Sequence, residues 1–324
     1  MRVLTAVLAL AAVTSFAPVF GKDKDKKKDP SEISNRDVGK GINFYSLERE
    51  IALGKQLAEE VVRQAKIVDD PLISEYVNRL GQNLVRHSDA KIPFTFKVID
   101  SEQLNAFALP GGFVFVNAGL LQMADTEAEL AGAMAHEIAH VAARHSTRQA
   151  TRGEIARYAT IPLIFMGGWG GYGAQQAAGM AIPMGFLKFS RGFEHEADLL
   201  GLQYLYAAGY DPAGAIDIFE KLLTLERKRP GSISKLFDTH PLTGDRLART
   251  QKAIQEILPG KLEYIVSTSE FDAMRARLVD MQNGRKREQE AGRPRLKRTP
   301  SGSVEQEQDS QEEPPVLRRR DLVE

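Results

Sequence analysis

The sequence contains no cysteine among its 324 residues. This absence excludes disulfides, thiol nucleophiles, cysteine-ligated zinc and acylation at a lipoprotein cysteine. A metal site in this chain would therefore need histidine and carboxylate ligands. The sequence also lacks an excess of charge of either sign, because 43 basic residues balance 43 acidic ones. Composition thus gives no indication of a nucleic-acid partner.

Residues 1–21 have the composition of a secretory signal peptide. A short basic start precedes the apolar run VLTAVLALAAVTSFAPVF, and Val19 and Gly21 occupy the −3 and −1 positions of a cleavage before Lys22. We therefore expect an exported protein, either periplasmic or secreted. The alternative is an uncleaved N-terminal segment that anchors the body of the protein to a membrane.

Two further stretches have a biased composition. Residues 22–40 open with KDKDKKKDPSE and are predicted to form a solvated linker, with contact between 22–28 and anionic lipid as the alternative. Residues 158–187 carry no charge and include seven glycines. We interpret this second stretch as an apolar hairpin or lid that would contact a membrane surface, with a buried loop of the core as the alternative.

The motif HEIAH, at residues 136–140, places two histidines one helical turn apart. Residues four apart on an α-helix differ by about 40° in direction, so His136 and His140 can share one tetrahedral Zn²⁺. Glu137 lies about 100° round from His136, which suits it to reach a water on the metal rather than to be a ligand. His145 lies about 180° from His136 on an ideal helix, so it cannot join the two histidines at a metal. We therefore interpret His145 as a polar residue near the C-terminal end of the helix.

A third ligand is expected from another helix, within SRGFEHEADLLG at residues 190–201. Glu194 and Asp198 are four apart and share one face of that helix, whereas Glu196 points away from it. Glu194 would complete a His₂Glu site that leaves a fourth position for water, and Asp198 would orient a ligating histidine. A purely structural zinc site is disfavoured because it would give Glu137 no role.

Four motifs, HEIAH, the acidic SRGFEHEADLLG, NAFALPGGFVFVNAGLL and THPLTGDR, together resemble the gluzincin zinc metallopeptidases of the HtpX, BepA and CAAX prenyl endoprotease type. The resemblance covers roughly residues 43–258 and implies one Zn²⁺ per chain. It also implies that Glu137 is the general base on a zinc-bound water. The implied ligands, with the aspartate behind them, are His136, His140, Glu194 and Asp198.

The resemblance extends to residues outside these two helices. His240 and Arg246 match the motif H-P-x-x-x-x-R, whose histidine lies near the zinc in such enzymes. This pair can stabilise the tetrahedral intermediate, or the histidine can occupy the open metal position and hold the enzyme latent. Asn105 matches a residue near the substrate cleft. The strand after LPGG resembles the edge strand along which these peptidases bind an extended substrate.

We therefore expect an α+β fold, a mainly helical zincin-type domain with a small β-sheet flanking the HEIAH helix. The expected function is hydrolysis of peptide bonds in unfolded or misassembled envelope proteins. A chaperone-like binding module for apolar segments, with latent or minor protease activity, is the alternative. The expected segments are a signal peptide (1–21), a charged linker (22–40), the zinc metallopeptidase domain (41–258), a short strand-helix extension (259–283) and a disordered charged tail (284–324).

Overall fold

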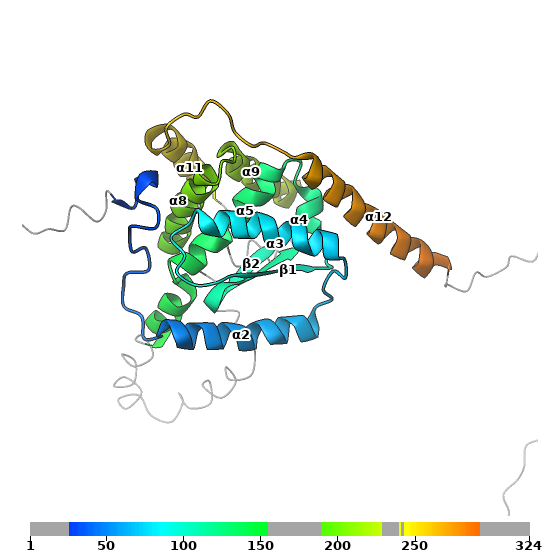
Figure 1. The fold of residues 1–324 in the computed structure, drawn as a ribbon, viewed down its shortest axis with the longest axis horizontal. Helices are drawn as coiled ribbons and strands as arrows, with labels where there is room; N and C mark the ends of the chain where they lie inside the picture. Colours follow the sequence, from blue (N-terminus) through cyan, green and yellow to red (C-terminus); the bar gives the residue numbers. More distant parts are fainter. Residues whose placement is uncertain (1–25, 155–188, 229–239, 241–242, 292–324) are drawn as a thin grey trace, which may run out of the picture. The chain divides into compact units, whose positions relative to one another are not determined.

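The computed structural model describes residues 26–154, 189–228, 240 and 243–291. The predicted signal peptide and the apolar segment 158–187 lie outside these ranges. Within them the chain is mostly helical, with one three-stranded sheet (Figure 1), so the predicted α+β fold class is confirmed. None of the helices described here is long and apolar enough to cross a membrane.

The sheet, the core and the candidate site belong to the first of two compact units, Met1–Gln282 and Asn283–Glu324. The described elements, in chain order, are η1 (Pro30–Glu32), α2 (Leu47–Gln64), α3 (Pro71–Arg86), β1 (Thr95–Ile99), β2 (Ala106–Leu109), η2 (Pro110–Gly112), β3 (Phe113–Asn117), α4 (Ala118–Met123), α5 (Glu127–Ala142), α8 (Arg191–Ala207), α9 (Ala213–Lys228), α11 (Gly244–Ile257) and α12 (Ser269–Ala291).

The sheet order is β1-β3-β2, with β1 parallel and β2 antiparallel to β3. Strand β3, which follows LPGG, pairs with β1 on one side and forms a hairpin with the short β2 on the other. The strand after LPGG is thus the central strand, so the prediction that it is the edge strand is wrong. The two outer strands are β1 and β2, and β2 follows directly from Asn105 in sequence.

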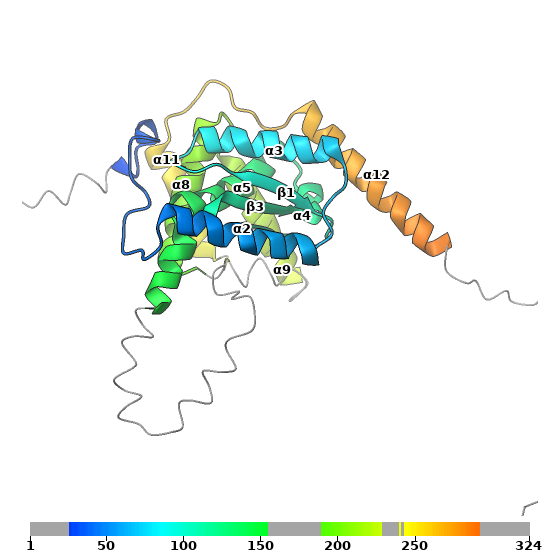
Figure 2. The ribbon, with the colours of Figure 1, turned by 60° about the horizontal axis from the view of Figure 1, so that its bottom comes forward.

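Apolar side chains on both faces of the sheet explain the layers of helices around it. One face joins the main core with α3 and α5, through residues such as Phe96 and Val114. The other face packs Phe115 against Ala58 of α2 in a smaller cluster. Helix α2 consequently runs along the side of the sheet opposite α3 and α5, as the two ribbon views show (Figures 1 and 2).

Helix α5, which carries HEIAH, is the centre of the fold. Every residue from Glu127 to Val141 is buried. Thr126 caps the helix by accepting from the amide of Glu129, and the Glu129 carboxylate accepts in turn from the amide of Asp125. Helix α8 packs closely across α5. The two helices are so close at Gly201 that an added Cβ would lie 3.0 Å from the backbone of Ala135 and His136.

Residues 26–40 of the predicted charged linker are held against the body at a few buried positions, and the prediction of a solvated spacer fails only there, because most of these side chains are exposed or half-buried. We call these residues the N-terminal strap. Arg36 and Val38 are buried, and Arg36 pairs with buried Asp89 at 2.9 Å. The charged composition of the strap did not predict this packing. One buried ion pair and its hydrogen bonds anchor the segment, and composition does not show which charges will pair.

Two predictions for the C-terminal part also need correction. The short strand expected in the extension 259–283 is reduced to one isolated bridge between Ile265 and Tyr210. Residues 284–291, expected to be disordered, continue helix α12 to Ala291. Lysine, arginine, glutamate and glutamine all have good helix propensity, so a densely charged sequence can extend a helix that is already nucleated.

Candidate metal centre

His136 and His140 project from the same side of α5 with their Nε2 atoms 3.1 Å apart. Both side chains are buried. Two ring nitrogens that face each other at this distance need a proton or a cation between them, because two lone pairs would otherwise repel each other. This arrangement follows from the four-residue spacing on a regular helix, as the sequence predicted.

Glu194 of α8 and His240 complete a cluster of four potential ligands. One ligand atom from each of the four residues lies within 4.8 Å of all the others, and all four residues are buried. Glu194 is 3.5 Å from Nε2 of each α5 histidine and 2.9 Å from Nδ1 of His240. Three imidazoles and one carboxylate are a donor set suited to zinc.

Two electrostatic observations support the fit of this cluster to a metal ion. Nε2 of His240 is buried and has no hydrogen-bond partner among the described residues. Burial acts to raise the pKa of Glu194, but the neighbouring imidazoles of His240 and His136 hold it well below its ordinary value. Glu194 is therefore an anion in a buried site, which is the state in which a carboxylate binds a cation.

Glu137 lies beside the cluster and is held by the sheet. Its Oε2 accepts a hydrogen bond from the amide of Ala108 on β2 at 2.9 Å, and its Oε1 is 3.5 Å from Nε2 of His240. Burial raises the pKa of the Glu137 carboxyl above its ordinary value. A raised pKa makes a carboxylate a better proton acceptor near neutral pH.

Asp198 and Arg246 form a layer behind the ligands. Oδ1 of Asp198 lies 3.1 Å from Nδ1 of His136. Arg246 makes a two-pronged contact with Asp198, at 2.8 and 2.6 Å, and its Nη1 is 2.8 Å from Glu194. The structure thus places Arg246 against the two carboxylates, and these contacts favour a positioning role over the donor role that the resemblance implies.

Asn105 lies immediately before β2. Its backbone carbonyl accepts from the amide of Asn117, and its side-chain Oδ1 is buried without a hydrogen-bond partner in the described part of the chain. The described lining of the small cavity beside the ligands includes the next residue, Ala106, with Leu120, Ala133 and Phe219. A role for Asn105 in the substrate cleft stays a prediction.

His145 is the residue that the sequence analysis placed wrongly. Arg144 has a φ of 56°, so α5 ends at Ala142 and the chain turns before helix resumes at 145. This turn brings His145 beneath His140, with their Nδ1 atoms 3.0 Å apart, although an ideal helix would place it on the far side. No sequence signal marks Arg144 as left-handed, because arginine rarely adopts that conformation.

Comparisons with known proteins agree with this geometry. A model of peptidase family M48 matches residues 71–254. The chain is 30% identical over 296 residues to the beta-barrel assembly-enhancing protease of Escherichia coli (strain K12), an alignment that covers 87% of this chain and 57% of that protein. The metalloprotease LoiP of the same strain is 30% identical over 197 residues, covering 60% of this chain and 76% of LoiP.

Another relative is the mitochondrial metalloendopeptidase OMA1 of Schizosaccharomyces pombe. It is 30% identical over 234 residues, which covers 69% of this chain and 66% of OMA1. The chain spans only a little more than half the length of the beta-barrel assembly-enhancing protease that it matches.

Proposed function

Since the chain belongs to peptidase family M48, we propose that it is an exported zinc endopeptidase that cleaves unfolded or misassembled proteins of the cell envelope. The observation that carries this proposal is the buried cluster of His136, His140, Glu194 and His240 with Glu137 beside it. Residues 1–21 support export through their composition.

The proposed reaction divides its roles among the clustered side chains. His136, His140 and Glu194 would hold the metal, which when bound supplies Lewis-acid activation of a water molecule and of the peptide carbonyl. Glu137 takes the proton from the attacking water and delivers it to the leaving amine. Asp198 orients His136 through Nδ1, and Arg246 holds both Asp198 and Glu194 in place.

Strand β2 is suited to bind the substrate backbone. Its residue Ala108 directs its amide away from β3 and toward Glu137, so this edge of the sheet faces the cluster. An extended peptide can add to such an edge by main-chain hydrogen bonds. The apolar lining beside it, which includes Leu120 and Phe219, would favour an apolar side chain next to the site. Both requirements favour unfolded segments, which expose extended backbone and apolar residues.

The test is cleavage of an unfolded protein, such as casein, by the purified chain. We expect cleavage that 1,10-phenanthroline abolishes and that a stoichiometric addition of Zn²⁺ restores, because the cluster offers no other source of an activated water. A tightly folded protein of similar size serves as the control substrate and should remain intact. Cleavage that continues in metal-free protein would contradict the proposal.

A second expected result concerns His240, whose contacts suit a fourth metal ligand that keeps the site closed. His240→Ala should retain zinc, because three ligands remain, and should raise kcat. The rise in kcat is on the order of tenfold if His240 leaves the metal position about a tenth of the time in the wild type. Zinc content and kcat for a defined peptide measure the two quantities.

The alternative role for His240 predicts the opposite sign. A donor to the developing oxyanion would, when removed, lower kcat by roughly 10²-fold while zinc stays bound. The direction of the change therefore separates the two roles. Unchanged kcat in the variant would contradict both and leave His240 a structural residue.

A further inference from the structure

The two histidines of α5 each have a polar group close to Nδ1, but the two groups differ. His136 contacts the carboxylate of Asp198 directly at 3.1 Å. His140 instead contacts Nδ1 of His145 at 3.0 Å, and Nε2 of His145 lies 3.1 Å from Oε2 of Glu196. Glu196 and Asp198 are two residues apart on α8, so that helix supplies a carboxylate for each α5 histidine.

A consistent set of tautomers satisfies every nitrogen in this second chain of contacts. If Nε2 of His140 faces a metal, its Nδ1 carries the proton and donates to Nδ1 of His145. His145 then carries its own proton on Nε2 and donates it to Glu196. Both imidazoles are neutral in this arrangement, and the carboxylate charge stabilises the orientation of His140 through one intervening ring.

The backbone at Arg144 is held in an unusual conformation that makes this contact. Its φ of 56° is unfavourable for a residue with a side chain. Two partners hold it there, since Nε of Arg144 donates to buried Glu50 at 2.7 Å and Nη2 to the carbonyl of Tyr45 at 2.6 Å. Strain that neighbouring residues maintain is typical of functional sites.

The ring of His145 is fixed further by stacking. It is fully buried and lies 4.4 Å, centroid to centroid, from the ring of Phe193, at an angle of 21° between planes. Glu196, beyond it, is held by two cations, Lys27 at 2.6 Å and Arg148 at 3.3 Å. Lys27 belongs to the N-terminal strap, so the strap is the outermost member of the chain of contacts.

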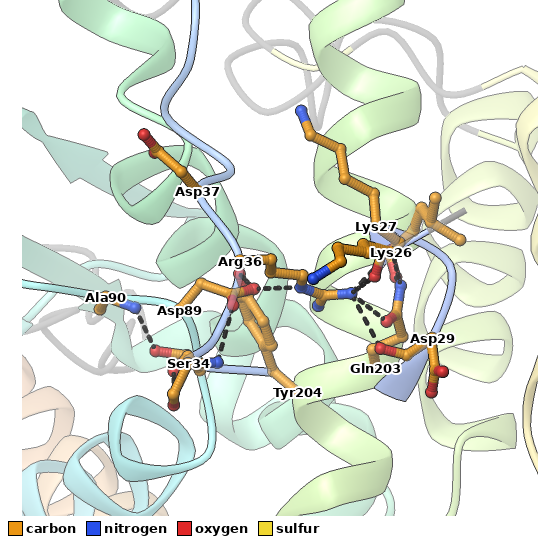
Figure 3. A network of polar contacts seen from close by, with 12 residues as sticks. Lys26, Lys27, Asp29, Ser34, Arg36, Asp37, Asp89, Ala90, Gln203 and Tyr204 are labelled. Atoms are coloured by element: carbon orange, nitrogen blue, oxygen red, sulfur yellow. Dashed lines mark hydrogen bonds and ion pairs between the residues drawn. The ribbon is translucent and has the colours of Figure 1, made fainter. Parts of the chain in front are cut away.

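The strap is anchored where it can hold Lys27 in place. Figure 3 shows Arg36 in the middle of a polar network that joins the strap to Asp89 and to Gln203 of α8. Nη1 of Arg36 also donates to the backbone carbonyls of Lys26, Lys27 and Asp29, and Gln203 donates to the carbonyl of Lys27. The backbone at Lys27 is thereby fixed from two sides.

We propose that His145 is a positioning residue that orients His140 for zinc, with its own orientation set by Glu196 and by Lys27 of the N-terminal strap. The inference rests on the proposed zinc site. It assigns a role to three residues that neither bind the metal nor touch substrate.

Zinc affinity of the full chain tests the proposal, measured by competition with a fluorescent chelator. His145→Ala and Glu196→Gln should each lower the zinc affinity by about 10- to 100-fold. This is the range found when residues that orient a ligating histidine are removed. The double variant should bind zinc no more weakly than His145→Ala alone, because Glu196 acts only through that ring. Thermal unfolding of the metal-free proteins shows whether each variant is folded.

Matched controls come from neighbouring residues of the same type. His195→Ala changes the histidine beside Glu196, and Lys26→Met changes the lysine beside Lys27; neither should alter zinc affinity. Lys27→Met should weaken zinc by at most about fivefold, because the Lys27–Glu196 pair is partly exposed. Lys27→Arg, which keeps the positive charge, should restore the wild-type affinity.

The outcomes separate this inference from the proposed function. A wild-type chain that binds no zinc would overturn the proposed function. Wild-type zinc affinity in folded Glu196→Gln protein, or additive losses in the double variant, would overturn the inference while leaving the zinc peptidase intact. If His145→Ala fails to fold, Glu196→Gln still decides the question.

Discussion

His136→Ala and His140→Ala are each expected to leave a folded chain that no longer retains zinc and no longer cleaves. Each change removes one of the two imidazoles that α5 holds 3.1 Å apart. Dividing about 10–16 kcal/mol of zinc binding among the three ligands His136, His140 and Glu194 gives about 3–5 kcal/mol for each. The loss of either histidine should thus weaken zinc binding by about 10²- to 10⁴-fold.

The measurement is zinc content by elemental analysis after dialysis against a weak chelator, together with cleavage of an unfolded substrate. His87→Ala is a suitable control, because His87 caps helix α3 and takes no part in the cluster. Wild type and control should hold about one zinc per chain. Full occupancy in either α5 variant would show that the metal lies elsewhere.

Helical periodicity was sufficient to predict the centre of this site. The spacing of His136 and His140 fixes their common direction on any regular helix, and α5 is regular over that stretch. The same argument placed Glu194 and Asp198 on one face of α8. The structure brings both of these carboxylates to the α5 histidines. Such predictions succeed because they depend on local geometry alone.

The sequence predicted less where local geometry departs from the ideal. Extending the helix of α5 through Arg144 put His145 on the wrong side, because the break at Arg144 depends on Glu50 and Tyr45, about a hundred residues earlier. The N-terminal strap was predicted to be solvated for a similar reason. Its anchor, Asp89, lies in the loop after α3, and only the folded chain brings it to Arg36.

The edge strand shows a third kind of failure. The strand after LPGG, β3, was predicted, but four residues of AFAL gave no periodic signal for β2. Without β2, the strand after LPGG would have been the edge. Its burial at almost every position marks it instead as central, paired on both sides. The order of strands depends on pairing, which composition alone does not specify.

Glu137→Gln is expected to lower the rate of peptide cleavage by about 10²- to 10⁴-fold, the usual contribution of a general base, while zinc stays bound. Glutamine has nearly the same shape, and its side-chain oxygen can still accept from the amide of Ala108. It cannot take a proton from the attacking water. The fold and the metal should therefore survive a change that removes the chemistry.

The same variant separates a peptidase from a chaperone-like binding module. A protein that only binds apolar segments should suppress the aggregation of an unfolded client equally well with Glu137 or glutamine at this position, since neither side chain contributes apolar surface. We expect Glu137→Gln to lose cleavage of casein, whereas Glu59→Gln, an exposed change on α2, keeps it. Undiminished cleavage by Glu137→Gln would exclude Glu137 as the base. The wild type could instead suppress aggregation fully and cleave nothing. That result would support the binding module, because the buried cluster of histidines and glutamates would then serve no hydrolytic reaction.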